Sequence, residues 1–464
     1  MRRDRPGLGE SAGWCSGRLV GAEGILPERI WTDSRDVQVG DGFVALPGGH
    51  SDGHAFIGES LARGARVIIC RAEGEASWIG QAKASGASLL LVEDTEKALL
   101  TIAEKYLEEV KPRQQIAVTG SMGKTTTREL IRSALAGPLH VHAARRSHNT
   151  LIGCALTVLS MPPETEILVF EMGTNHPGEI AAIVEKFPPT IAVITAIAPV
   201  QLEGLGSLEG VLAAKLEIIP KNGLDLLIYN SDDERLSMAL EKADFPFRMA
   251  GVGFGRGSTL LLTEATESMG GVLRVGLSYG GQSWVCESLL KGPHHAYNLG
   301  FAFMTGVAIG VSPEVILQGM TKVAPLKGRG MWFRDGRVHL VIDESYNANP
   351  SSVAAALEVI SSLESPGKRW AVLGGMKELG ERSGELHREI LDKTGFLDGL
   401  VLVGKEWEPF LAEGHPGGIP MWWAEDAGSA SELLEGLVGK RDTVLVKGSR
   451  FYGLERVVYR LAGS

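Results

Sequence analysis

Disulfides, zinc sites and membrane spans have no support in this sequence. The chain contains four scattered cysteines, Cys15, Cys70, Cys154 and Cys286. None of them stands in a C-x-x-C pair, so neither a zinc site nor a disulfide framework is indicated, and we expect reduced thiols in a cytoplasmic protein. The N-terminus lacks the apolar segment of a signal peptide, and no apolar run is long enough to span a membrane. We therefore expect no membrane insertion.

Concentrated positive charge is also lacking. The chain has 46 Lys and Arg against 56 Asp and Glu, a net charge of −10, and no run rich in Lys or Arg. This balance argues against nucleic acid or an anionic membrane as the main partner, whereas a local loop could still bind a phosphorylated small molecule. With 464 residues the chain is too long for one core, and we expect two or three domains in a monomer.

Two common nucleotide-binding patterns are missing as well. The dinucleotide pattern G-x-G-x-x-G follows none of the expected strands, which argues against a dinucleotide-dependent oxidoreductase. The glycine-rich segment GVGFGRG (251–257) lacks this spacing, and we interpret it as a flexible turn. The usual P-loop, G-x-x-x-x-G-K-[ST], does not fit either, because Val118 stands where its first glycine would fall.

What the chain does contain is a repeated alternation of apolar strands and helical segments. The runs QIAVTG, EILVFEMG and TIAVITAIA are continuously apolar and rich in β-branched residues, which is typical of strands buried on both faces of a parallel sheet. A helix is expected at 95–110, before the break at Lys111-Pro112. Further strands are expected at 65–70 and 88–93 and within 225–240, 339–350, 369–380, 399–407 and 442–450.

We predict an α/β protein of three domains. A small N-terminal α/β domain is expected at 1–112, a central domain with a P-loop-type parallel sheet at 113–325, and a C-terminal Rossmann-like α/β domain at 326–464. Ligands of open α/β sheets bind at the carboxyl ends of the strands, so the functional residues are expected there.

The segment IAVTGSMGKTTTREL (116–130) has the features of a shortened phosphate-binding loop. Gly120 and Gly123 let the backbone turn its N–H groups toward an anion, and the helix expected from Lys124 points its positive end at the same place. Lys124 would neutralise the β- and γ-phosphates, and Thr125 would bind Mg²⁺. The alternative, an ordinary glycine turn, is disfavoured by the strand before the segment and the helix after it.

A carboxylate for the same metal ion is expected at the end of another strand. Glu171 ends the apolar run ILVFE and precedes MGTNH, so it is placed to reach Mg²⁺ near the γ-phosphate. The alternative is a solvated or helix-capping glutamate, and the nearby loop favours the metal role.

The shortened loop resembles that of the Mur ligase superfamily, whose members are ATP-dependent amide-forming ligases with the pattern T-G-[ST]-x-G-K-[ST]. TGSMGKTT fits this pattern from Thr119 to Thr126. The resemblance extends over nearly the whole chain, through WTDSRDVQVGDGFVALPGGHSDGHAFI, EMGTNHPGEI, GSLEGVLAAKLEI, DESYNANPSS, ELGERSGELH and VLVKGSR. It implies phosphate contacts from Gly120, Ser121, Met122, Gly123, Lys124, Thr125 and Thr126.

Within the superfamily, Y-N-A-N-P is typical of the members that join D-alanyl-D-alanine to UDP-N-acetylmuramoyl-tripeptide. The resemblance therefore implies a ligase of cytoplasmic peptidoglycan precursor synthesis that works through an acyl phosphate. Whether the third residue of the tripeptide is lysine or a diaminopimelate stays open. The T-D-S-R and D-G-H segments imply a uridine-nucleotide role for the N-terminal domain, with Ser34, Arg35, Asp52 and His54 in contact with the substrate.

The resemblance also implies two Mg²⁺ ions. Lys215 matches a lysine that becomes carbamylated, a change that would turn a repulsive ammonium into an oxygen ligand. From the segment alone, the alternative is a surface lysine on a helix. The implied metal ligands are Thr125, Glu171, Gln201 and carbamylated Lys215.

Further roles are carried over position by position. The resemblance implies ATP contacts from Asn298, Arg329, Asp343, Tyr346 and Asn347. It implies catalytic roles for Lys124, Glu171, Lys215 and His176. It implies contacts with the growing peptide or the dipeptide from Asn149, Asn175, Lys447, Ser449 and Arg450.

Four positions depart from the family pattern. Gln201 stands where histidine is usual, His295 and Ser147 where asparagine is usual, and Gly375 where aspartate is usual. Two alternative hypotheses therefore stay open. One is a sister ligase that adds a single amino acid, such as folylpolyglutamate synthase, and the other is a P-loop protein that binds ATP without ligating. Substrate-dependent ATP turnover distinguishes them.

Overall fold

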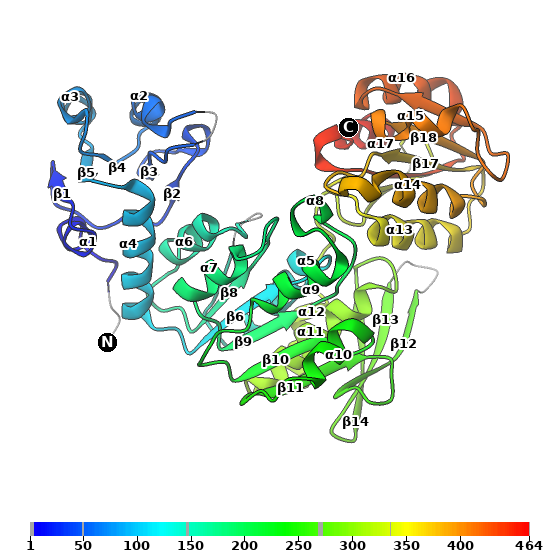
Figure 1. The fold of residues 1–464 in the computed structure, drawn as a ribbon, viewed down its shortest axis with the longest axis horizontal. Helices are drawn as coiled ribbons and strands as arrows, with labels where there is room; N and C mark the ends of the chain where they lie inside the picture. The colour runs from blue at the N-terminus through cyan, green and yellow to red at the C-terminus, as the bar shows by residue number, and fades with distance from the viewer. Residues whose placement is uncertain (1–3, 49–50, 145–147, 268–271, 335, 464) are drawn as a thin grey trace.

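The computed structural model describes residues 4–48, 51–144, 148–267, 272–334 and 336–463, and their strands form three β-sheets. The sheets follow one another along the chain, and the domain built around the second sheet lies between the other two (Figure 1). The predicted three-domain α/β fold is confirmed, because each sheet is largely parallel and accompanied by helices. None of the described helices combines the length and apolar character needed to cross a membrane.

The N-terminal domain contains a five-stranded sheet in the order β1-β5-β4-β3-β2, with β1 antiparallel to β5 and the other neighbours parallel. The two expected strands are β4 and β5, whose apolar residues are buried because helices cover the sheet. The strands are β1 (Arg18–Val20), β2 (Ile30–Trp31), β3 (Gly42–Val44), β4 (Val67–Arg71) and β5 (Ser88–Val92), and the helices are α1 (Leu8–Trp14), η1 (Ser34–Asp36), η2 (Gly53–Phe56), α2 (Ile57–Ala62) and α3 (Glu75–Ser85).

Helix α4 (Thr95–Val110) carries the chain into the central domain and has the predicted bounds. Asp94 caps its first turn by accepting the Lys97 N–H at 3.0 Å. The helix ends at Lys111, whose φ of 48° is left-handed. A single buried cluster runs from the first sheet through α4 to the strands of the second, so the N-terminal domain is anchored by a shared core.

The central domain has nine strands in the order β14-β13-β12-β11-β10-β9-β6-β8-β7. Pairs from β7 to β12 are parallel, and the expected strands are β6, β8, β9 and β10. The antiparallel extension β12–β14 was not predicted, because its strands mix buried with exposed residues and their apolar runs are short. The strands are β6 (Gln114–Thr119), β7 (Val141–Ala143), β8 (Ile167–Glu171), β9 (Ile191–Ile194), β10 (Leu226–Asn230), β11 (Arg248–Gly253), β12 (Leu260–Glu267), β13 (Leu273–Tyr279) and β14 (Gln282–Ser288), and the helices are α5 (Lys124–Leu135), α6 (Leu151–Leu159), α7 (Glu179–Lys186), α8 (Leu202–Leu205), α9 (Leu208–Leu216), α10 (Glu234–Glu241), α11 (His295–Ala308) and α12 (Pro313–Met320).

The glycine-rich segment 251–257 differs from its prediction as a flexible turn. Its first three residues end strand β11. The Asp232 carboxylate accepts the N–H groups of Phe254 at 2.6 Å and Gly255 at 2.9 Å, and the Tyr297 hydroxyl donates to it at 2.8 Å. The turn is therefore fixed by one carboxylate that the sequence did not associate with it.

The C-terminal domain contains six strands in the order β15-β16-β20-β17-β18-β19, with β15 antiparallel to β16 and the rest parallel. The expected strands are β16, β17, β18 and β20. The strands are β15 (Met331–Arg334), β16 (Leu340–Glu344), β17 (Arg369–Gly374), β18 (Gly399–Val403), β19 (Met421–Ala424) and β20 (Thr443–Lys447), and the helices are α13 (Pro350–Ser362), η3 (Gly380–Arg382), α14 (Ser383–Asp392), η4 (Lys405–Trp407), α15 (Glu408–Leu411), α16 (Ala427–Leu437), η5 (Arg450–Tyr452) and α17 (Glu455–Ala462).

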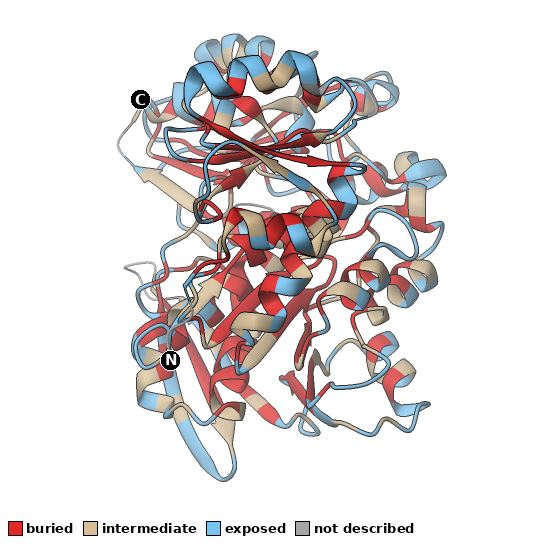
Figure 2. Ribbon diagram, turned by 90° about the vertical axis from the view of Figure 1, so that its left-hand side faces the viewer, coloured by how far each residue is buried: buried red, intermediate tan, exposed pale blue. Residues whose placement is uncertain are grey.

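Helix α8 of the central domain packs against the C-terminal domain. Leu202 and Leu205 belong to the same buried cluster as residues of the C-terminal sheet such as Leu373. The Glu203 N–H donates to the Glu378 carbonyl at 3.2 Å. Figure 2 shows the buried residues concentrated in the strands and the exposed ones on the outer helix faces.

Candidate functional site

A cavity of about 800 Å³ is lined by residues of both the central and the C-terminal domain. Glu171 and Asn230 reach it from the ends of β8 and β10, and Glu344 and Lys447 reach it from the ends of β16 and β20. All four strands are parallel members of their sheets. The cavity therefore lies where the predictions expected ligands, at the carboxyl ends of the strands.

The predicted phosphate-binding loop connects β6 to α5, and residues 121–126 line the cavity. Gly120 has a φ of 137°, and a Cβ there would lie 2.1 Å from Thr195 Oγ1. Gly123 has a φ of 80°, and a Cβ there would lie 2.5 Å from Asn298 Oδ1. Both positions require glycine, because the conformation and the close neighbours exclude a side chain.

Lys124 is the first residue of α5 and points back into the loop. Its Nζ donates to the Gly120 carbonyl at 2.6 Å. Burial lowers the pKa of this ammonium from its ordinary value, while the carboxylate of Glu171 opposes that shift. A partly buried cation at a helix N-terminus is suited to a polyphosphate.

Glu171 is buried at the end of β8, which disfavours the solvated alternative. Its Oε1 lies 3.4 Å from Asn149 Nδ2 and its Oε2 lies 3.1 Å from Arg128 Nη1. Thr125, the loop residue expected to bind metal, lines the same cavity. Arg128 was missed by the sequence analysis, although its place one helical turn after Lys124 on α5 could have marked it.

Lys215 and Gln201 both carry buried polar atoms without a partner. Lys215 is 0% exposed, so the surface-lysine alternative is wrong, and its Nζ makes no hydrogen bond within the described residues. Burial, with the charge of Lys124, lowers the pKa of Lys215 to about 7. Gln201 Oε1 is likewise buried without a partner among the residues that the structure describes, and its backbone is left-handed with a φ of 53°.

These orphaned atoms fit a site that is completed by ligands. Among the described residues, no group of three or more His, Cys, Asp or Glu side chains could hold a metal ion. Mg²⁺ commonly uses one or two carboxylates together with substrate phosphates rather than a cage of protein ligands. The residues present fit that kind of site.

The C-terminal wall of the cavity is cationic. The Arg329 guanidinium lies 4.0 Å from the centroid of the Tyr346 ring, and Arg450 Nη1 donates to the Tyr346 hydroxyl at 3.2 Å. Lys447 is buried, and its Nζ donates to the Asn347 carbonyl at 3.0 Å. Burial lowers the pKa of Lys447, in spite of the carboxylate of Glu344. The predicted residues Arg329, Tyr346, Asn347, Lys447, Ser449 and Arg450 all line the cavity.

His294 and His295, at the start of α11, explain one departure from the family pattern. Asn298 Nδ2 lies 2.9 Å from His295 Nδ1, which therefore accepts the hydrogen bond. Burial holds the pKa of His295 well below its ordinary value and lowers that of His294 to about 4. The pair is neutral near pH 7, and with Asn298 it lines the cavity beside the phosphate-binding loop.

Among the residues predicted to contact ATP, metal or the peptide, Gly120, Lys215, Asp343 and His176 do not line the cavity. Asp343 is buried behind the cavity wall, where its carboxylate accepts the Gly328 N–H at 2.9 Å and the Ser345 hydroxyl at 2.6 Å. His176 is exposed and does not line the cavity, whereas its neighbour Asn175 does. The carboxylate of Asp343 therefore holds the backbone at Gly328 and Ser345 in place and does not face the cavity.

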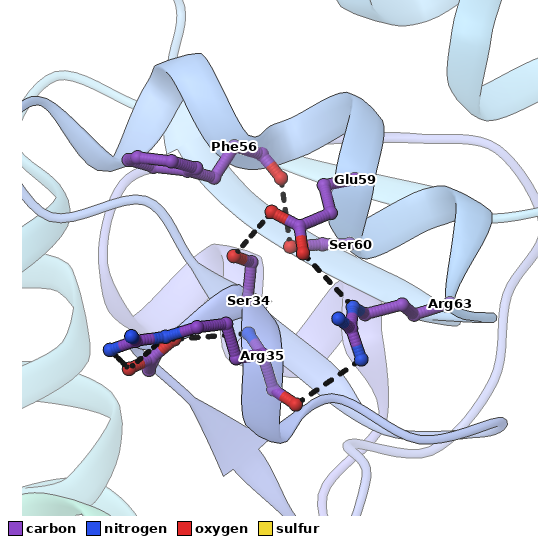
Figure 3. Close-up of polar contacts among 7 residues, drawn as sticks. Ser34, Arg35, Phe56, Glu59, Ser60 and Arg63 are labelled. Atoms are coloured by element: carbon purple, nitrogen blue, oxygen red, sulfur yellow. Dashed lines mark hydrogen bonds and ion pairs between the residues drawn. The ribbon is translucent and has the colours of Figure 1, made fainter.

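The predicted N-terminal residues do not line the cavity and form two networks of their own. Ser34 Oγ donates to Glu59 at 2.8 Å, and Arg63, which also pairs with Glu59, donates to the Arg35 carbonyl at 3.3 Å (Figure 3). Asp52 pairs with His54 and Arg71. His54 Nε2 accepts the Arg71 N–H at 2.9 Å.

Two departures remain. Ser147 lies outside the described residues. Gly375 follows β17, and a Cβ there would lie 2.3 Å from Glu406 Oε2. The Glu406 carboxylate pairs with Lys377 and accepts a hydrogen bond from Tyr452. A carboxylate from η4 therefore fills the space in which a side chain at 375 would lie.

The three domains and the loop-bearing cavity define a nucleotide-binding α/β protein. Residues 28–114 match the Mur ligase family catalytic domain, 118–306 the Mur ligase middle domain, and 328–450 the Mur ligase glutamate ligase domain. The UDP-N-acetylmuramoyl-tripeptide–D-alanyl-D-alanine ligase of Bacillus subtilis is 32% identical over 94% of this chain and 93% of its own length. The chain therefore belongs to the Mur ligase family.

Solved structures agree over the same length. MurF from Acinetobacter baumannii superimposes with a TM-score of 0.82 and 26% identity, and each chain is covered completely. MurF from Thermotoga maritima in complex with ADP has a TM-score of 0.76 and 28% identity, covering 94% of this chain and 98% of that one. The expected Mur ligase resemblance is confirmed.

Proposed function

We propose that this chain is an ATP-dependent ligase that joins D-alanyl-D-alanine to UDP-N-acetylmuramoyl-tripeptide in peptidoglycan synthesis. The names of its relatives, which it matches over nearly their full length, support this assignment. The observation that carries it is the cavity in which the phosphate-binding loop of one domain faces cations of another. Both halves of such a cavity are needed to bring three charged reactants together.

The reaction has two steps. The tripeptide carboxylate attacks the γ-phosphorus of ATP and ADP leaves, which gives an acyl phosphate. The dipeptide amine then attacks the acyl carbon, loses its proton, and phosphate leaves as the amide forms. Lys124 and the loop N–H groups neutralise the phosphates, and Arg329 stabilises the charge from the opposite wall.

We propose that Thr125, Glu171 and Gln201, together with a carbamate on Lys215, hold Mg²⁺ in this cavity. The ion, when bound, screens the phosphate charge that the incoming carboxylate would otherwise meet. The buried Lys215 amine supports this role, because a pKa of about 7 leaves much of it neutral and able to add CO₂ at physiological pH. Labelling with ¹³CO₂ should give a carbamate NMR signal that disappears in Lys215→Met.

The remaining assignments belong to the same proposal. Asn298, Tyr346 and Asn347 contact the nucleoside of ATP, whereas Asn149, Asn175 and His176 contact the tripeptide. The N-terminal domain binds the uridine nucleotide through Ser34, Arg35, Asp52 and His54. We place the domain boundaries at 112 and 325, and the reaction in the cytoplasm, where ATP and nucleotide sugars occur together.

The test is phosphate release from Mg-ATP with UDP-N-acetylmuramoyl-tripeptide, measured with and without D-alanyl-D-alanine. Release that requires both substrates is the expected result. Release with a single amino acid in place of the dipeptide would assign the sister activity. Bound ATP without any release under either condition would assign a binding protein and overturn the proposal.

A further inference from the structure

A small recess connects the phosphate-binding loop to the C-terminal domain. Its volume is about 80 Å³. Ser121, Lys124 and Gln201 line it from the central domain. Lys377 and Ser449 line it from the C-terminal domain, and all five also line the main cavity. A molecule lying in the recess would therefore touch the loop at one end and Lys377 at the other.

The backbone on both walls of this recess is strained. Gln201 has a φ of 53° and Glu378 a φ of 64°, and both residues line the recess. Left-handed conformations are unfavourable for residues other than glycine, and such strain is concentrated at functional sites. The Glu203 N–H donates to the Glu378 carbonyl at 3.2 Å, which ties the two strained segments together across the domain boundary.

Lys377 is held at the recess by an unusual set of neighbours. Its Nζ pairs with the Glu406 carboxylate, which also accepts the Tyr452 hydroxyl. The same Nζ lies 4.4 Å from the centroid of the Phe451 ring and 5.0 Å from that of Tyr452. The side chain keeps 28% of its surface exposed. An ammonium has three N–H donors, so one ion pair leaves Lys377 able to bind an anion.

The other cations of the cavity are engaged differently. Lys124 donates to the Gly120 carbonyl within the phosphate-binding loop. Lys447 is only 3% exposed and is held between Glu344 and the Asn347 carbonyl. Arg329 and Arg450 both lie over Tyr346.

Lys377 thus differs from the other cations that line the cavity. It is the lysine of the C-terminal wall that is both partly exposed and placed on the recess leading to the phosphates. The sequence analysis did not single it out.

We infer that Lys377 binds the terminal carboxylate of the incoming dipeptide, a role that rests on the proposed ligase function. An extended dipeptide spans about 7 Å, so a carboxylate on Lys377 would leave the amine directed along the recess toward the loop. Phe451, which lines the cavity with 75% of its surface exposed, offers an apolar face beside the ammonium for a methyl side chain.

The experiment compares D-alanyl-D-alanine with its C-terminal amide, which lacks the negative charge. A charge-assisted hydrogen bond contributes enough for the wild-type enzyme to prefer the acid by about tenfold to a hundredfold in kcat/KM. In Lys377→Met the acid should fall to the level of the amide, and Lys377→Arg should keep most of the preference. Lys393→Met, an exposed lysine on the same domain, is the matched control.

The ratio of the two substrates is insensitive to the fraction of folded protein, so a general loss of stability cannot imitate the result. The KM for ATP should change little in Lys377→Met. If Lys377→Met keeps the wild-type ratio, the carboxylate binds elsewhere and the inference is wrong. An equal rate for acid and amide in the wild-type enzyme would also overturn it. Failure of the ligase function itself would look different, because no dipeptide would then trigger phosphate release.

Discussion

Arg128 Nη1 lies 3.1 Å from Glu171 Oε2, and both side chains are only 3% exposed. The second arm of the guanidinium lies 2.8 Å from Glu129 Oε1. One oxygen of Glu171 is thus committed to Arg128, while the other lies near Asn149 at the cavity wall. The arginine fixes the direction in which the carboxylate presents its other oxygen toward Asn149 and the cavity.

Because Glu171 is a proposed ligand of Mg²⁺, replacing Arg128 should weaken metal binding. In Arg128→Met we expect the Mg²⁺ concentration for half-maximal phosphate release to rise about tenfold to a hundredfold, as is usual when a partner of a metal ligand is removed. The free energy of unfolding should fall by about 3 kcal/mol, because Glu171 stays buried without its partner. Arg128→Lys should retain part of the Mg²⁺ affinity and part of the free energy of unfolding that Arg128→Met loses. Mn²⁺ binding followed by EPR provides a readout that is independent of turnover, and an unchanged affinity there would contradict the prediction.

Lys215 should make stability depend on pH. Its pKa falls from 10.5 in the unfolded chain to about 7 in the folded one, so between these values the unfolded state binds the extra proton and stability rises with pH. In CO₂-free buffer at pH 6, Lys215→Met should be more stable than the wild type by about 3 kcal/mol. This gain should shrink toward pH 10. Urea unfolding at several pH values measures this gain, and a gain that does not change with pH would show that burial leaves the pKa of Lys215 at its ordinary value.

The sequence was sufficient for those parts of the molecule that depend on local patterns. Continuous apolar runs marked the parallel strands, and two glycines before Lys124 marked the loop, because a backbone approaching an anion leaves no room for Cβ atoms. The strands β12–β14 were missed because a sheet with one solvated face has no such run.

Contacts between segments that are distant in the chain could not be predicted from the sequence. Lys377 meets Glu406 across 29 positions, and Arg128 meets Glu171 across 43. Lys377 has no local signal that distinguishes it from a solvated charge, and Arg128 has only its place one helical turn after Lys124. The packing of the sheets brings each pair together. Asp343 shows the converse, because the family resemblance implied a contact with ATP, whereas its carboxylate accepts the backbone N–H groups of Gly328 and Ser345.

Because Gly375 and Glu406 lie close together, we predict that a carboxylate at position 375 can replace the one at position 406. In Gly375→Asp the new side chain meets the Glu406 carboxylate, which lies 2.3 Å from the added Cβ. We expect a loss of about 2 to 4 kcal/mol from crowding and like-charge repulsion. Glu406→Ala alone leaves Lys377 without its carboxylate. The double variant should recover most of the stability, because the introduced aspartate would supply the charge to Lys377 from the other side.

A double-mutant cycle on urea unfolding checks this exchange. The coupling free energy between positions 375 and 406 should favour the double variant by more than about 1 kcal/mol. Additive losses would mean that Glu406 does not occupy the place of a side chain at 375. Gly384→Asp, at a position with open space around it on α14, serves as the control for adding an aspartate to the same domain.

Arg5 should be the strongest single tie between the N-terminal and central domains. Its guanidinium donates to the carbonyls of Leu26 and Pro27 on one side and of Leu159 and Met161 on the other, at 2.5 to 3.2 Å. Arg5→Met removes the guanidinium from all four carbonyls, of which that of Met161 keeps the Tyr106 hydroxyl as a donor. We expect the free energy of unfolding to fall by about 3 kcal/mol. Arg5→Lys should recover only part of this free energy, because one ammonium cannot reproduce the planar arrangement of donors on the guanidinium.

The exposed Arg66 of the same domain gives the matched control. Arg66→Met should change the free energy of urea unfolding by less than about 0.5 kcal/mol. The KM for the uridine nucleotide, whose proposed site is in the N-terminal domain, should rise in Arg5→Met. The KM for ATP should stay near its wild-type value, because neither Arg5 nor the residues whose carbonyls it binds line the ATP cavity. A loss in Arg5→Met no greater than in Arg66→Met would show that water satisfies these carbonyls and that the shared apolar core alone joins the two domains.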